Sequence, residues 1–168
     1  VHCNRDDGDD EECNGGDPMY SKSQRIYGYE TNDGSFAQCT TVQSRQLLKK
    51  PVHLSWEESG CYTLTLATAY RMLFGHPPHA LRPGMNVLVW GSSGGIGSMA
   101  VQICKAVGAN AIGIVSDDDK IPFVEKLGAV GVLNRKKYEC FGQLPDVEDQ
   151  KKYSDFIKKC RVLGKDIW

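Results

Sequence analysis

The first feature of this sequence that could do chemistry is a glycine-rich loop, Gly91-Ser92-Ser93-Gly94-Gly95-Ile96-Gly97. Glycines let a backbone approach a ligand closely, and the amides at the start of a helix carry partial positive charge, so such a loop can hold a phosphate group. We expect Gly94 and Gly95 to allow that approach, and Gly97 to let a helix pack closely on a strand. Because glycines also mark plain turns, the flanking elements must decide between the two interpretations.

Those flanking elements place the loop between a strand and a helix. An apolar run predicts a strand over Asn86–Trp90, and the loop leads into a predicted helix from about Gly95 to Val107. A second strand, a second helix and a third strand are predicted next: Ala111–Val115, Pro122–Leu127 and Gly131–Leu133. A β-α-β-α-β unit implies a parallel sheet with right-handed crossovers. The sequence therefore predicts the first half of a Rossmann dinucleotide-binding domain over positions 81–168, with a pyrophosphate held by the loop.

Positions 1–80 carry a different pattern, which predicts part of another domain. The start of the chain is rich in Gly, Asp and Asn, and its strand-like run Ser35–Val42 is short, so we expect irregular β structure and loops. Ser55 and Glu58 have the spacing of a capping box, which predicts a helix from there to about Leu73. We expect Tyr70 and Leu73 of this helix to lie in the core.

Composition and charge exclude several classes of partner. The 168 residues have a net charge of −1, with Lys and Arg scattered among acids, so the broad positive field that collects nucleic acid is missing. The longest apolar region is broken by the glycine loop, Lys105 and Asn110, and falls short of the roughly 20 residues of a membrane span. Seven cysteines without paired spacing indicate reduced thiols. We expect a cytoplasmic protein that binds neither nucleic acid nor membrane.

The two ends of the chain lead to two further expectations. The acidic run over positions 6–12 lacks the alternating oxygen ligands and the central glycine of a calcium loop, so we expect a solvated loop there. The chain starts without Met and ends at Trp168, where a doubly wound sheet would continue with further strands. We therefore expect it to be a fragment.

The residues after the second predicted strand leave the cofactor open between NAD and NADP. Asp117 lies near the spacing at which an acid holds the ribose hydroxyls of NAD. Ser116, Lys120 and Arg135 instead offer the hydroxyl and the cations that a 2′-phosphate requires. From the residues alone the two choices are nearly even, and Asp117 can also be an ordinary turn residue.

Longer motifs give the chain a family likeness. Asp33-Gly34-Ser35-Phe36-Ala37 and Leu66-Ala67-Thr68-Ala69-Tyr70 precede the glycine loop in the order seen in medium-chain dehydrogenases/reductases. More specifically, the chain resembles the crotonyl-CoA carboxylase/reductase family in several stretches: Gly15-Gly16-Asp17-Pro18-Met19-Tyr20, Ser23-Gln24-Arg25-Ile26, Gly28-Tyr29-Glu30-Thr31, Phe74-Gly75-His76 and Phe141-Gly142-Gln143-Leu144-Pro145. The resemblance implies an α/β chain: part of a GroES-like β domain with a linking helix over positions 1–80, followed by the N-terminal half of a Rossmann domain.

The resemblance also implies the cofactor and its contacts. The family looks like an NADPH user, which favours Ser116, Lys120 and Arg135 as the 2′-phosphate contacts and makes Asp117 a bystander. Gly91, Ser92, Ser93, Gly94, Gly95, Ile96 and Gly97 would then bind the pyrophosphate. Thr68 is expected to face the cofactor, with packing between helices as the competing interpretation. The resemblance implies no catalytic zinc and, in the complete protein, a homo-oligomer.

The implied reaction is reductive carboxylation of an enoyl-CoA. Hydride transfer to the β-carbon of crotonyl-CoA leaves an enolate, and capture of carbon dioxide by its α-carbon gives ethylmalonyl-CoA. The family's carbon dioxide pocket matches Tyr29 and Glu30, where Glu30 would orient its partners through hydrogen bonds. From the residues alone Glu30 is an ordinary loop carboxylate.

Two other functions stay open on the sequence. One is a zinc-free enoyl-CoA or quinone reductase that binds NADPH but never carboxylates. The other, of a different class, is a dinucleotide-binding structural protein without turnover, because a fold by itself does not establish catalysis.

Overall fold

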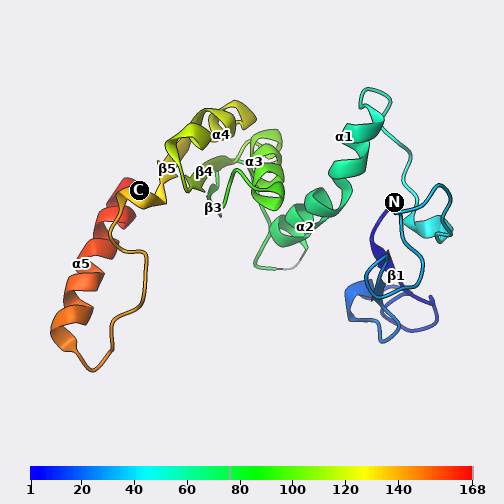
Figure 1. Ribbon diagram of the computed structural model, residues 1–168, viewed down its shortest axis with the longest axis horizontal. Coiled ribbons are helices and arrows are strands. Elements are labelled where there is room, and N and C mark those ends of the chain that lie inside the picture. The colour runs from blue at the N-terminus through cyan, green and yellow to red at the C-terminus, as the bar shows by residue number, and fades with distance from the viewer. Residues whose placement is uncertain (76, 168) are drawn as a thin grey trace. The chain divides into compact units, whose positions relative to one another are not determined.

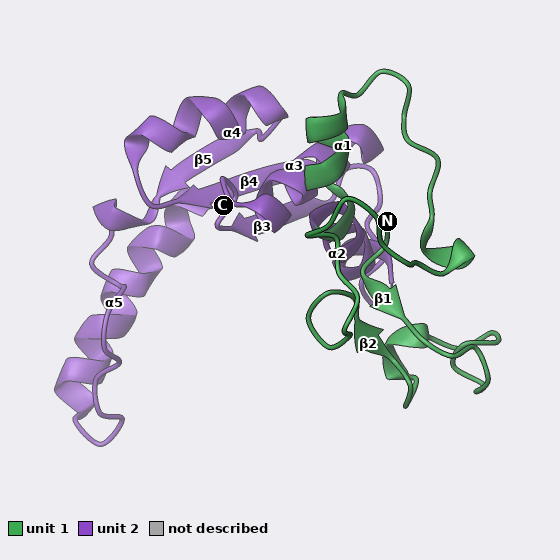
Figure 2. Ribbon diagram, turned by 45° about the vertical axis from the view of Figure 1, so that its right-hand side comes forward, with its two compact units in different colours: residues 1–64 green, residues 65–168 purple. Residues whose placement is uncertain are grey.

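The structure, a computed structural model, describes residues 1–75 and 77–167 and divides into two compact units, residues 1–64 and residues 65–168 (Figure 2). His76 of the family motif and the terminal Trp168 therefore lie outside the described residues. The boundary between the units precedes the domain boundary expected at position 80, because helix α2 (Thr63–Phe74) contributes Ala69 to the core of the second unit.

The first unit consists mainly of loops with short regular elements. These are strands β1 (Asn4–Arg5) and β2 (Arg25–Ile26), which pair antiparallel, the 3-10 helices η1 (Pro18–Tyr20) and η2 (Ser44–Gln46), and helix α1 (Trp56–Cys61) (Figure 1). The irregular β structure and loops expected for this part of the chain agree with the structure, in which the strand-like run Ser35–Val42 forms no strand. Phe36 is fully exposed there, so no buried face favours strand pairing.

Polar side chains from the acidic run help to hold the first unit together. Asp6 is buried, and its Oδ1 lies 2.7 Å from Nη2 of Arg45. Asp10 accepts hydrogen bonds from the Ser21 hydroxyl at 2.7 Å and from the Cys13 amide at 3.0 Å. Hydrogen bonding from the Cys13 side chain, the Ser21 hydroxyl and the Cys13 amide lowers the pKa of Asp10 to about 2. The expectation of a solvated loop is therefore wrong for Asp6 and Asp10.

The predicted capping box is confirmed, but the helix after it is interrupted. The Ser55 hydroxyl accepts from the Glu58 amide at 3.1 Å, and the Glu58 carboxylate accepts from the Ser55 amide at 2.8 Å. Helix α1 then ends before Tyr62, and helix α2 begins at Thr63. The two hydrogen bonds of the capping box satisfy backbone amides that have no acceptor within the helix.

Helix α2 packs through a smaller side chain than expected. Ala69 is 1% exposed, whereas Tyr70 is 59% exposed, so the core position expected for Tyr70 is wrong. The Tyr70 ring instead lies 4.7 Å from the Phe74 ring. Leu73 is partly buried against the core, as expected. A small residue at the point of contact lets a helix backbone approach its neighbour closely.

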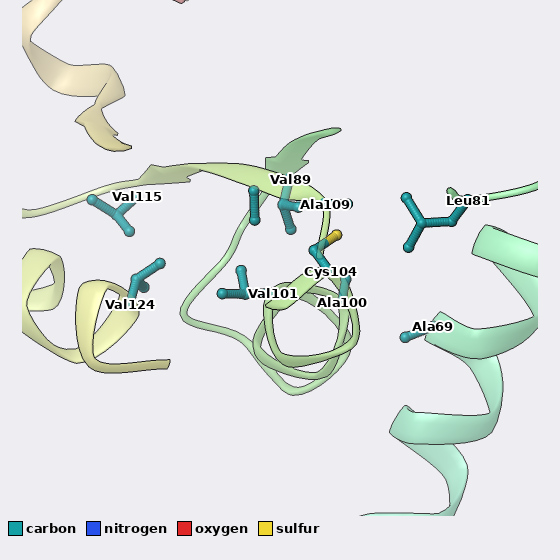
Figure 3. Close-up of a cluster of buried hydrophobic side chains, with 10 residues drawn as sticks. Ala69, Leu81, Val89, Ala100, Val101, Cys104, Ala109, Val115 and Val124 are labelled. Atoms are coloured by element: carbon teal, nitrogen blue, oxygen red, sulfur yellow. The ribbon is translucent and has the colours of Figure 1, made fainter. Parts of the chain in front are cut away.

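The second unit contains a three-stranded parallel sheet in the order β3-β4-β5. The predicted strands and helices are confirmed to within a residue or so at their ends: β3 (Asn86–Trp90), α3 (Gly95–Val107), β4 (Asn110–Val115), α4 (Ile121–Leu127) and β5 (Gly131–Asn134). Helices α3 and α4 lie on the same face of the sheet, as Figure 3 shows. Two crossovers of the same hand between successive neighbouring strands give this arrangement.

The hydrophobic core lies between this sheet and its helices. Its buried side chains come from all five of these elements except β5, and from α2 and the loops: Ala69, Leu81, Val89, Ala100, Val101, Cys104, Ala109, Ala111, Val115 and Val124 (Figure 3). Burial raises the pKa of the Cys104 thiol, as expected for a cysteine used as a small apolar residue. This core holds the carboxyl ends of β3 and β4 in fixed register.

The remaining elements follow the strands of the sheet. They are the 3-10 helices η3 (Asp118–Lys120) and η4 (Arg135–Lys137), and the long charged helix α5 (Gln150–Ile167). The Tyr138 hydroxyl donates to Asp166 at 2.8 Å, and Lys159 pairs with Glu139 at 3.1 Å, so α5 is tied to the segment after η4. None of the helices in the described part of the chain is long and apolar enough to cross a membrane.

Candidate functional site

The glycine loop forms a tight turn at the carboxyl end of β3. Gly91 has a φ of +62°, a conformation that favours glycine, and its carbonyl accepts from the Gly94 amide at 2.8 Å. A Cβ on Gly97 would lie 2.3 Å from the Gly91 carbonyl oxygen. Only a glycine therefore lets the first turn of α3 pack against the loop at this point, and the packing role predicted for Gly97 is confirmed.

The start of α3 presents backbone donors. Its N-cap, Gly94, has no side chain to satisfy them. The amides of Gly95, Ile96 and Gly97 lie in the first turn, where a helix offers no internal acceptor, and they make no other backbone hydrogen bond to a described residue. Unpaired amides at the positive end of a helix dipole are the donors that a phosphate oxygen requires.

The two serines of the loop have different surroundings. Ser92 is fully buried, and both its hydroxyl, at 3.2 Å, and its amide, at 3.1 Å, donate to the Ile114 carbonyl. On β4, Gly113 leaves room for this side chain, because a Cβ there would lie 2.7 Å from the Ser92 hydroxyl. Ser92 thus ties the loop to β4, and its predicted contact with the cofactor stays a prediction. Ser93 is half-buried and faces a pocket.

Replacing Ser92 by alanine should therefore affect stability more than ligand binding. Loss of the hydrogen bond to Ile114 is expected to lower the free energy of unfolding by about 1 kcal/mol. Urea unfolding would measure this change, and a cofactor titration should give an affinity within about twofold of the original. Ser93→Ala is the matched variant and should show the reverse behaviour. If Ser92→Ala weakens the cofactor more than Ser93→Ala does, Ser92 is a contact after all.

Helix α2 approaches the start of α3 closely. A Cβ on Gly95 would lie 2.9 Å from the Thr65 methyl group, so Gly95 also makes room for α2. Thr68 lies one turn further along α2 and is half-buried. Its predicted contact with the cofactor stays a prediction.

A pocket of about 200 Å³ opens at the carboxyl ends of the parallel strands. It brings together four of the predicted cofactor residues with three others at the strand ends: Trp90, Gly91, Ser93, Ile114, Val115, Ser116 and Arg135. Sequence reasoning missed Trp90, whose ring packs edge-on against Phe141 with centroids 5.6 Å apart. Trp90 could have been predicted from its position as the last residue of β3, because ligands of open α/β sheets bind at these strand ends.

Next to the pocket, one carboxylate holds a polar cluster together. Asp117 Oδ2 accepts from the Ser116 hydroxyl at 2.9 Å and from Lys120 at 3.5 Å, and its Oδ1 accepts from Lys136. Lys120 also donates to the Ser116 hydroxyl, at 2.8 Å. Hydrogen bonds from Lys136 and Ser116 lower the pKa of Asp117 to about 2. Asp117 is therefore the common acceptor of this cluster, and its expected lack of a cofactor contact stays a prediction. Lys136 is a residue that the sequence analysis missed.

Arg135 differs from these lysines because its guanidinium makes no ion pair or hydrogen bond within residues 1–75 and 77–167. Its neighbour Lys137 is paired with Asp118 at 2.9 Å, and Asp118 also accepts from Asn134 at 3.0 Å. Arg135 is thus an exposed, unpaired cation that lines the pocket. Such a planar donor is suited to a phosphate group.

The predicted catalytic pair lies in the first unit, in a turn after β2. The Glu30 carboxylate accepts from the Ile26 amide at 2.8 Å, and the Glu30 amide donates to the Ile26 carbonyl at 2.8 Å. Tyr29 is 82% exposed. Glu30 is therefore fixed by its own backbone turn, while its chemical role stays a prediction.

Comparison with known proteins supplies the context for this geometry. Residues 95–154 match the family model described as zinc-binding dehydrogenase. Across the described ranges, no three His, Cys, Asp or Glu side chains form a group that could hold a metal ion. The chain is 65% identical over all 168 residues to crotonyl-CoA carboxylase/reductase of Cereibacter sphaeroides, and it spans 39% of that protein's length.

Solved structures agree with the sequence comparison. A crotonyl-CoA carboxylase/reductase matches the whole chain with a TM-score of 0.94 and 64% identity, and the match covers 39% of that structure. A 2-octenoyl-CoA carboxylase reductase, CinF, in complex with NADP and 2-octenoyl-CoA, matches 98% of the chain with a TM-score of 0.84 and 36% identity, and 36% of that structure is covered. The predicted fold class is confirmed, and the chain is similar over its whole length to one segment of the crotonyl-CoA carboxylase/reductase family, within the medium-chain dehydrogenases/reductases.

Proposed function

We propose that this chain is the NADPH-binding part, with a portion of the catalytic domain, of an enzyme that reductively carboxylates an enoyl-CoA. The observation that carries the proposal is the pocket at the carboxyl ends of β3 and β4, which Arg135 lines and which shares Gly91 and Ser93 with the glycine loop. That loop leads directly into the unpaired amides at the start of α3, so the two features together offer sites for phosphate. The relative from Cereibacter sphaeroides, which is named both a carboxylase and a reductase, supports the reaction class. The solved relative bound to NADP and 2-octenoyl-CoA supports the cofactor and the thioester class.

The residues of the site fit a dinucleotide with a 2′-phosphate. The amides of Gly95, Ile96 and Gly97 would hold the pyrophosphate, and Gly91 and Gly94 keep that side of the loop free of side chains. Ser116, Lys120 and Arg135 would hold the 2′-phosphate, because they combine a hydroxyl with two cations near the end of β4. When bound, NADPH supplies the hydride for the β-carbon of the enoyl thioester.

The protein must also control which reaction the α-carbon of the enolate undergoes. Once the β-carbon is reduced, the enolate can form a C–C bond to carbon dioxide or take a proton from water, so water must be kept away. We assign Glu30 and Tyr29 to the carbon dioxide pocket. Glu30, held by the Ile26 amide, would orient pocket partners through its remaining acceptor positions, since carbon dioxide has no net charge to pair with it.

Two properties of the whole protein belong to the same proposal. Its seven free cysteines suit the reducing cytoplasm, where we expect it to work. By the family resemblance we expect it to work as a homo-oligomer, with an enoyl-CoA and carbon dioxide as its partners.

The direct test follows NADPH oxidation by the intact protein with crotonyl-CoA, with and without bicarbonate, and identifies the product by mass. Ethylmalonyl-CoA that forms only with bicarbonate supports the proposal. Butyryl-CoA under both conditions identifies a plain enoyl-CoA reductase, and absence of oxidation despite NADPH binding identifies a binding protein without turnover.

The catalytic assignment of Glu30 is tested by Glu30→Gln. The amide oxygen of glutamine can still accept from Ile26, so the turn should survive. We expect the share of butyryl-CoA among the products to rise severalfold at a fixed bicarbonate concentration, because pocket partners lose an ionised acceptor. Glu11→Gln, at an exposed glutamate of the same unit, is the control and should leave the product ratio unchanged. Equal product ratios in both variants would remove Glu30 from the pocket.

A further inference from the structure

The cluster around Asp117 has a feature that the proposed contacts do not use. Its single carboxylate receives hydrogen bonds from three donors: the Ser116 hydroxyl, the Lys120 ammonium and the Lys136 ammonium. Two of these, Ser116 and Lys120, are assigned above to the 2′-phosphate. The Asp117 carboxylate therefore accepts hydrogen bonds from donors that the cofactor phosphate would also require.

The donors around Asp117 resemble the surroundings of a bound anion. A hydroxyl and two ammonium groups that converge on a pair of oxygens are a donor set that serves a phosphate as well as a carboxylate. Lys120 and Lys136 both contact the carboxylate of Asp117, so these three side chains together carry a net positive charge that favours an additional anion. Hydrogen bonding from Lys136 is the largest cause of the lowered pKa of Asp117.

We propose that Asp117 is an internal counter-ion that competes with the 2′-phosphate for Lys136, which makes Lys136 a further determinant of cofactor specificity. The inference rests on the proposed function, because it presupposes a cofactor with a 2′-phosphate. Without the cofactor, Lys136 is held by Asp117 beside the pocket. When the phosphate is present, Lys136 donates to the phosphate, whose two negative charges attract it more strongly than one carboxylate does.

The neighbouring lysine provides a matched control. Lys137 lies next to Lys136 in η4 and has nearly the same exposure, 61% against 63% for the side chain. It pairs with Asp118 at 2.9 Å, and Asp118 is itself held by Asn134. Replacing either lysine by glutamine removes the same charge from the same turn, so a difference between the variants reports the contact and not the net charge.

The experiment measures the dissociation constants of NADPH and NADH for the intact protein by titration of the nicotinamide fluorescence. Lys136→Gln should raise the dissociation constant of NADPH about tenfold and leave that of NADH within about twofold, because only NADPH loses a charged hydrogen bond. Lys137→Gln should leave both constants within about twofold. An equal rise in the dissociation constant of NADPH in the two variants would overturn the proposed role of Lys136.

Asp117→Asn tests whether Asp117 competes with the phosphate, because removal of a competitor should strengthen NADPH binding. Asparagine keeps an acceptor for the Ser116 hydroxyl but removes the charge, so NADPH should bind about threefold more tightly and NADH should not. In a chain that already carries Lys136→Gln, this gain should be smaller, because the substitution can then release only Lys120. Weaker NADPH binding by Asp117→Asn, or the same gain in both backgrounds, would overturn the competition. If the unsubstituted protein shows no preference for NADPH over NADH, the proposed function has failed, not this inference alone.

Discussion

Gly97→Ala is expected to lower the NADPH affinity of the protein by about 10- to 100-fold and to lower its stability. The new methyl group would lie 2.3 Å from the Gly91 carbonyl oxygen and 2.8 Å from the Ser92 Cα, so the loop or the start of α3 must move. Overpacking of this kind costs about 1–3 kcal/mol, and 1.4 kcal/mol corresponds to a tenfold change in affinity. Fluorescence titration and thermal unfolding measure the two effects.

Gly164→Ala is the control for this substitution. Gly164 is also a helical glycine, in α5, but a Cβ there meets nothing within 4 Å. Alanine should leave NADPH binding unchanged and stabilise the helix by up to about 1 kcal/mol. If Gly97→Ala bound NADPH within about threefold of the original, the close approach of α3 to the loop would not be needed for cofactor binding.

Arg135→Gln is expected to reduce NADPH affinity about 100-fold while NADH affinity stays within about twofold, because each hydrogen bond between charged groups contributes roughly 1.5–3 kcal/mol. The guanidinium lines the pocket and has no partner of its own among the described residues, so its loss leaves the fold intact. The two dissociation constants, measured in parallel, give the change in cofactor preference.

Arg161→Gln supplies the control for charge. Arg161 is exposed on α5 and does not line the pocket. It should leave the preference between NADPH and NADH unchanged. An equal fall in affinity for both cofactors in Arg135→Gln would indicate that Arg135 contacts a part common to both, such as the pyrophosphate, and would remove it from the 2′-phosphate site.

The second unit was more predictable than the first because its signals are local and repeated. Each strand of the sheet is a short apolar run, and each helix ends at a glycine with a positive φ, Gly108 or Gly128. The first unit lacks such periodicity. Its order depends on polar contacts between residues far apart in the sequence, such as Asp6 with Arg45, which no local pattern reveals.

Residue types and their spacing were enough to predict the strand-loop-helix order around Gly91–Gly97 and the need for glycine at position 97. They also identified the hydroxyl and cations offered by Ser116, Lys120 and Arg135. These features follow from local backbone preferences and from side-chain chemistry. The burial of the Ser92 side chain and the contact between Lys136 and Asp117 became visible only in the folded chain. The direction of a side chain and the partner of a long flexible cation depend on which strand ends meet at one edge of the sheet. That edge is formed by segments more than 15 residues apart, and so the packing of the whole unit, not any short stretch of sequence, selects these contacts.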